Sequence, residues 1–149
     1  MIDINNESGT EIDEKRLQRL AFFILEQLRI HPKSELSVLL VDEQTMAGYH
    51  EKFMGEPGPT DVLSFPMDEL RPPTDDEDAP EGLLGDVVLC PAQAALEAEK
   101  SGRDVDSELD YILTHGVLHL LGFDHATYPD HKVMFDLTER LIAMWDRLR

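Results

Sequence analysis

The sequence predicts an α+β fold, a small mixed β-sheet packed with helices, and three observations support this prediction. The chain has 149 residues, which suits a single domain spanning residues 1–149 with a proper hydrophobic core. Hydrophobic residues make up 42% of the chain, as is typical of a globular protein. Strand-like runs and longer stretches with helical periodicity follow one another in the order βαβαββααα.

Apolar spacing and capping residues define the elements of the first half. Residues 2–5 alternate as a short strand, and residues 13–30 predict a helix that Asp13 caps. Residues 36–41 are apolar on both faces and therefore predict a central strand. Residues 42–54 predict a second helix, capped by Asp42, before a turn cluster rich in glycine and proline.

The strands of the second half flank an acidic segment. Residues 60–66 predict a strand, and Pro66 indicates that it ends at or near a sheet edge. Residues 68–81 are acidic and proline-rich, which predicts a surface loop. Residues 83–90 predict another strand, whose last residue, Cys90, is expected to be a buried small side chain rather than a nucleophile.

Three helices complete the chain. Residues 91–100 predict a helix that starts at a proline and stops at Gly102. Residues 104–121 predict the next one, with Ser107 and Asp110 as a capping pair. The last helix is expected over residues 129–148.

Composition limits the classes of function. The chain carries 31 acidic and 13 basic residues, a formal net charge of −18, and such a surface repels phosphate backbones on average. A nucleic-acid function would therefore need a local cationic surface, which we expect around the first helix from Lys15, Arg16, Arg19, Arg29 and Lys33. We expect no signal peptide and no membrane span, and the single cysteine fits a reducing cytosol.

The stretch HGVLHLLGFDH, residues 115–125, carries the strongest chemical signal. His115 and His119 are one helical turn apart and project from the same face. Gly122 can end the helix in a left-handed conformation, so that the chain turns back and brings His125 towards the other two histidines. Three imidazoles that leave one position open are typical of catalytic zinc, which predicts one zinc ion per chain on a central helix.

The histidine spacing resembles the metzincin peptidase motif, but the catalytic glutamate of that motif is absent. In metzincins this glutamate follows the first histidine and takes a proton from the zinc-bound water, whereas here Gly116 occupies the position. We therefore expect another reaction, with His115 as the functionally essential ligand.

Two further motifs extend the resemblance to a known family. PTDVLSFP (residues 59–66) and GDVVLC (residues 85–90), together with HGVLHLLGFDH, resemble the YbeY family of bacterial metal-dependent endoribonucleases over about residues 38–144. The resemblance implies zinc on the three histidines, a bacterial cytoplasmic location and cleavage of single-stranded RNA. It also implies maturation of the 3′ end of small-subunit ribosomal RNA and ribosome quality control. Two alternatives remain: a zinc metallohydrolase acting on peptides or amides, and a non-catalytic ribosome-associated factor with structural zinc.

One departure from the family affects substrate binding. Many members carry Tyr-Arg where this chain has Phe53 and Met54, so the role of that arginine cannot be transferred. His50 and Lys52 are nearby cations that could replace it, or they are simply solvated residues of a short helix.

Other candidates surround the motifs. Ser64 and Phe65 could line the substrate groove or be plain strand residues, and Asp124 could orient a histidine ligand or cap the turn. His131 is not expected to be a ligand. The expected partners are ribosomal RNA and the small ribosomal subunit or a basic ribosomal protein. The loop at residues 68–81 would contact such a partner, repel random RNA or only add solubility.

Overall fold

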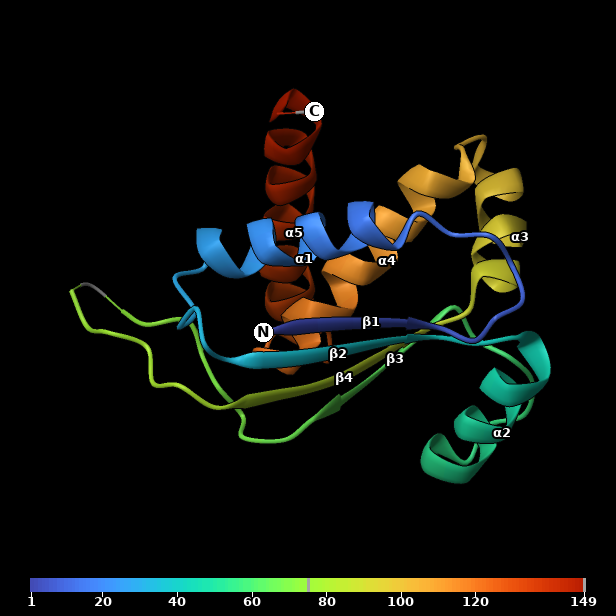
Figure 1. Cartoon of the computed structure of the whole chain (residues 1–149), viewed down its shortest axis with the longest axis horizontal. Coiled ribbons are helices and arrows are strands. Elements are labelled where there is room, and N and C mark those ends of the chain that lie inside the picture. The colour runs from blue at the N-terminus through green and yellow to red at the C-terminus, as the bar shows by residue number, and fades with distance from the viewer. Residues whose placement is uncertain (75, 149) are drawn as a thin grey trace.

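The computed structural model describes residues 1–74 and 76–148, and within them the elements follow the predicted order (Figure 1). The strands are β1 (Ile2–Asn6), β2 (Glu35–Leu40), β3 (Val62–Pro66) and β4 (Leu83–Leu89). The helices are α1 (Glu14–Gln27), α2 (Glu43–Met54), α3 (Pro91–Ser101), α4 (Val105–Leu120) and α5 (Tyr128–Leu148). The α+β prediction is confirmed.

The sheet is mixed and has the order β1-β2-β4-β3. Strands β1, β2 and β4 are parallel, whereas β3 pairs with β4 in the antiparallel direction. The apolar strand β2 is therefore central, as its two apolar faces predict, and β3 forms an edge, as Pro66 predicts.

Helices cover the two faces of the sheet unequally. Figure 1 shows α1, α4 and α5 stacked on one face, while α2 lies across one end of the other face. The larger apolar cluster, which includes Leu20, Val38 and Leu113, fills the first interface. A smaller cluster under α2 contains Met46 and Cys90, whose thiol is fully buried and has a raised pKa because of that burial.

Local hydrogen bonds explain where the helices begin and end. Asp13 and Asp42 cap α1 and α2 as predicted, each accepting a hydrogen bond from a backbone N–H three residues later. Helix α1 ends at Gln27 instead of residue 30, because Arg29 adopts a φ of 59° and the N–H of Ile30 donates back to the Leu25 carbonyl at 3.0 Å. This turn brings Ile30 into the core.

The predicted capping pair of α4 is wrong. Asp104 caps this helix by accepting from the Ser107 N–H at 2.7 Å. Asp110 lies further along the helix, where its side chain is buried and forms an ion pair with Arg16 of α1. A cap must precede the first turn, so Asp110 is too far along the helix to serve as one. Arg16, only 9% exposed, is likewise no part of a cationic surface.

The segment between β3 and β4 has no regular secondary structure in its described residues and extends beyond the end of the sheet opposite α2 (Figure 1). Asp75, one of its acids, lies outside the described residues. Among the helices that the structure describes, none combines the length and apolar character needed to cross a bilayer.

Candidate metal centre

The three motif histidines meet at the C-terminal end of α4. The Nε2 atoms of His115 and His119 lie 3.1 Å apart, and the chain then turns at Gly122, with a φ of 94°, to bring His125 back. One ligand nitrogen from each of the three rings falls within 4.8 Å of the others. Two nitrogens bound to one tetrahedral zinc would lie about 3.3 Å apart, because each Zn–N bond is about 2.0–2.1 Å, so the cluster could hold a metal ion.

The protonation state of the cluster suits metal binding. Burial, together with the smaller effect of positive charge on the neighbouring histidines, lowers the pKa of His115 to about 4. Burial also lowers the pKa of His119, an effect that Asp124 partly offsets. Both rings are therefore neutral near pH 7, as a metal ligand must be.

Gly116 lets α4 lie close against the edge of the sheet. A methyl group at this position would lie 2.7 Å from Cγ1 of Val87 and 3.0 Å from Cγ2 of Val62. The carbonyl of Gly116 accepts a hydrogen bond of 2.8 Å from the Ser64 hydroxyl, which ties α4 to β3. The space that a glutamate would need at this position is thus occupied by strand side chains.

The histidines line one wall of an open hollow of about 710 Å³, here called the histidine cleft. Strand β3, the end of α2 and the turn after α4 form its other walls. Carboxylates of Glu56, Asp61 and Asp124 line it as well. The cleft is thus an open site with three neutral nitrogen donors and acidic walls.

The structure separates the two β3 residues predicted to line a groove. Ser64 points towards α4 and lines the histidine cleft, whereas Phe65 packs under α2 on the other face. Neighbouring residues of a strand alternate between the two faces, so Ser64 and Phe65 cannot share one wall. The Phe65 ring contacts Phe53 edge-on, with their centroids 5.1 Å apart.

The two α2 residues considered as substitutes for the family arginine are separated in the same way. His50 lines the histidine cleft, with Nδ1 at 2.9 Å from the Gly58 carbonyl and Nε2 at 3.3 Å from a Glu56 carboxylate oxygen. The Lys52 ammonium lies over the ring of Phe53, 5.2 Å from its centroid, and Lys52 is not among the cleft residues.

Asp124 and His131 flank the cluster. The Asp124 carboxylate accepts the backbone N–H of His125 at 2.7 Å, so it stabilises the turn that carries this ligand. The ring of His131 lies 6.5 Å from that of His125, between centroids, and stacks on Phe135. Among the described residues, the group that meets metal-ligand spacing consists of His115, His119 and His125.

Asp61 was not singled out by sequence reasoning, although the PTDVLSFP motif contains it. It lines the histidine cleft, and burial raises the pKa of its carboxyl group. Its backbone carbonyl accepts the N–H of Cys90 at 2.9 Å, which fixes the start of β3 beside β4. The available signal was the position of Asp61 within this motif, directly before the strand.

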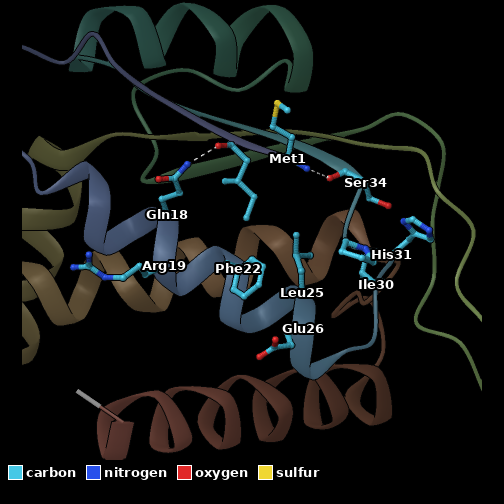
Figure 2. A pocket seen from close by; sticks show the side chains of 11 residues that line it. Met1, Gln18, Arg19, Phe22, Leu25, Glu26, Ile30, His31 and Ser34 are labelled. Atoms are coloured by element: carbon cyan, nitrogen blue, oxygen red, sulfur yellow. Dashed lines mark hydrogen bonds between the residues drawn. The ribbon is translucent and has the colours of Figure 1, made fainter.

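A second hollow, of about 560 Å³, lies between α1, the start of β1 and the turn before β2 (Figure 2). Phe22, Leu25 and Ile30 give it an apolar wall. Its polar groups are partly used within the protein, since the Met1 amino group donates to the Ser34 carbonyl and Gln18 donates to the carbonyl of Ile2. Among the described residues no metal-ligating group forms there.

Comparisons with known proteins agree with this architecture. A family model described as Endoribonuclease YbeY matches residues 3–146. A relative from Cutibacterium acnes named Endoribonuclease YbeY is 62% identical over 98% of this chain and 94% of its own. A Thermobifida fusca relative of the same name is 57% identical over the same shares.

A solved structure supports the fold. The solution structure of a Thermotoga maritima protein matches 99% of this chain and 93% of its own with a TM-score of 0.67 and 26% identity. The family model, the curated relatives and the three histidines at the end of α4 therefore lead to one identification: the chain belongs to the YbeY endoribonuclease family.

Proposed function

We propose that this protein is a metal-dependent endoribonuclease that cleaves single-stranded RNA, with residues 1–149 acting as one domain. The observation that carries the proposal is the cluster of His115, His119 and His125, which lies in an open cleft of a chain that belongs to the YbeY family. A structural zinc site is normally closed by four protein ligands, whereas this cluster offers three.

The donor set fits zinc. Three neutral imidazoles favour zinc or a similar transition metal over magnesium and calcium, which prefer oxygen ligands. His115, His119 and His125 would hold one ion per chain. When bound, such an ion supplies Lewis acidity, which polarises a phosphate oxygen or lowers the pKa of a coordinated water.

RNA chemistry can proceed without the glutamate that a peptidase needs. The ribose 2′-hydroxyl is a nucleophile that the substrate itself brings, and a group of the cleft other than residue 116 would take its proton. The Ser64 hydroxyl donates to the carbonyl of Gly116 and is therefore a wall group rather than a free nucleophile. Asp61, with its raised pKa, is the cleft carboxyl best suited to hold a proton near the scissile linkage.

We further propose that the substrate is the 3′ end of small-subunit ribosomal RNA, in bacterial cytoplasm and within ribosome maturation and quality control. The net charge of −18 supports this choice of context. A free acidic protein binds naked RNA weakly, whereas docking on the small subunit or a basic ribosomal protein would bring the cleft to one RNA end.

Cleavage assays test the activity. Purified protein is incubated with structured RNA, single-stranded RNA and casein, each with and without a chelator. We expect chelator-sensitive cleavage of the single-stranded RNA, its loss in His115→Ala and its retention in the nearby control His131→Ala. Chelator-sensitive cleavage of casein with intact RNA would identify a metallohydrolase acting on peptides instead.

A second assay tests the substrate. An RNA fragment with the precursor 3′ end of small-subunit ribosomal RNA is compared with a shuffled sequence, both free and within ribosomal particles. We expect the particle-bound precursor to be cleaved fastest. Particle binding without any RNA cleavage would favour the non-catalytic ribosome-associated factor.

A further inference from the structure

The described wall of the histidine cleft lacks a permanently charged cation. Among the described residues that line it there is no lysine or arginine, while Glu56, Asp61 and Asp124 contribute carboxylates. The whole chain carries a net charge of −18. Apart from the proposed metal ion, a lysine or arginine that binds RNA phosphate at this cleft must therefore come from a neighbouring segment.

Arg71, at the start of the acidic segment, reaches the turn that joins the histidine ligands. A methyl group built on Gly122 would lie 2.5 Å from Cζ and 2.8 Å from Cδ of Arg71, so the arginine side chain lies directly against the glycine backbone. Gly122 lines the histidine cleft, and its N–H donates to the carbonyl of His119 at 3.1 Å. The guanidinium thus lies beside the turn between His119 and His125, against a glycine that forms part of the cleft wall.

The backbone before Arg71 is held in place from both sides. The Asp68 N–H donates to the Leu83 carbonyl at 3.0 Å, and the Leu83 N–H donates to the Asp68 carboxylate at 2.7 Å, which continues the pairing with β4. Leu70 is 8% exposed and belongs to the main apolar cluster. The side chain of Arg71 therefore starts from a fixed point, although its segment is irregular.

The charge of Arg71 is not used within the described protein. Its Nη1 donates to the carbonyl of Leu70 at 3.1 Å, and in the described chain it forms no ion pair with a carboxylate. Arg16 and Arg103, by contrast, each pair with an acid of α4. The Arg71 residue is also exposed, so its remaining N–H groups can meet a ligand.

We propose that Arg71 is a substrate-positioning residue that binds a phosphate of the RNA strand next to the cleaved linkage. The inference rests on the proposed endoribonuclease function. A planar guanidinium can donate two parallel hydrogen bonds to two phosphate oxygens, which a lysine cannot do. Gly122 is then required for two reasons, the turn between the ligands and the space for this side chain.

The experiment compares Arg71→Gln, Arg71→Lys and the control Arg147→Gln. Arg147 is exposed and lies 19 residues beyond the start of α5, about 28 Å along the helix. Cleavage of a single-stranded RNA is measured with the metal-loaded protein. Affinity for the same RNA is measured across salt concentrations in the presence of a chelator, together with metal content and melting temperature.

We expect Arg71→Gln to lower kcat/KM by about tenfold or more through KM, since it loses a charge-assisted contact to phosphate. The plot of log affinity against log salt has a negative slope. Its magnitude should decrease by about 0.7, the value for one phosphate of a single strand. Arg71→Lys should restore the slope but only part of kcat/KM. Metal content and melting temperature should match those of the unmodified protein, and Arg147→Gln should change none of these quantities.

Two results overturn the inference. The first is that Arg71→Gln binds and cleaves RNA like the unmodified protein. The second is that Arg71→Gln binds less metal or melts at a lower temperature, to an extent that accounts for its lower activity. An unmodified protein that cleaves no RNA would instead contradict the proposed function. The salt-dependent affinity still decides the role of Arg71 in that case, because an unchanged slope in Arg71→Gln excludes a phosphate contact.

Discussion

The two ends of α4 carry polar side chains in opposite arrangements. At the N-terminal end, buried acids are neutralised within the protein: Asp110 pairs with Arg16, and Glu108 pairs with Arg103 at 2.6 Å. At the C-terminal end, the rings of His115 and His119 form no ion pair in the described structure and stay neutral because their pKa values are lowered.

The difference distinguishes polar groups that hold the fold from groups that await a ligand. A charge buried in the core costs free energy unless a partner neutralises it, so the acids of α4 have partners from α1 and from the turn before α4. Neutral imidazoles at an open cleft do not require a partner. They keep their nitrogen lone pairs available for a metal ion.

The largest expected effect comes from breaking the buried ion pair. Asp110→Ala leaves the Arg16 guanidinium without its buried partner and should lower the free energy of unfolding by about 3–5 kcal/mol. Urea denaturation measures this loss. Asp106→Ala is the matched control, because Asp106 also contacts Arg16, at 3.3 Å, but is exposed, and it should cost about 0–1 kcal/mol. Equal losses in both variants would contradict the contrast between the two ends.

The next effect concerns the histidine end. His119→Ala should reduce metal affinity by tens of fold or more, because it removes one of three ligand nitrogens, while the apo protein stays folded. Elemental analysis after dialysis gives the metal content. His131→Ala should retain about one ion per chain, since His131 lies outside the cluster. Full retention of zinc in His119→Ala would show that the metal assignment is wrong.

A smaller effect is expected where α4 touches the sheet. Gly116→Ala places a methyl group 2.7 Å from Val87 and should cost about 1–3 kcal/mol of unfolding free energy through overpacking. Gly48→Ala on α2 is the control, because nothing lies within 4 Å of that position and alanine favours helices. Gly116→Glu should be destabilised further and should show no peptidase activity. An unchanged free energy of unfolding in Gly116→Ala would mean that the close packing of α4 on the sheet does not require a glycine at this position.

The smallest effect is expected from the acidic segment at residues 68–81. Replacing Asp76, Glu77 and Asp78 by their amides, with Arg71 kept, removes three negative charges from this segment. If these acids repel random RNA, affinity for a generic RNA hairpin should rise a few fold at low salt, as measured by fluorescence anisotropy. Binding to ribosomal particles should weaken or stay the same. Unchanged hairpin affinity at low salt would leave only partner contact or solubility as the role of the segment.

Local patterns predicted much of the fold and of the metal cluster. The caps at Asp13 and Asp42, the apolar strand β2 and the order of the elements are all confirmed. The cluster was predictable for the same reason: two histidines one turn apart, followed by a glycine turn, restrict the third histidine to a nearby position. These features depend on backbone conformation over a few residues.

Only the tertiary structure decided which distant residues meet. Asp110 contacts Arg16 across 94 positions of the chain, and Arg71 lies against Gly122 across 51, so neither contact has a local signature. Each depends on how α4 packs on α1 and on the sheet edge, and that packing follows from the burial of apolar surface by the whole chain. The sequence alone therefore determined the ligands of the candidate metal site, while long-range packing determined which charges are neutralised and which cation lies against the turn between the histidines.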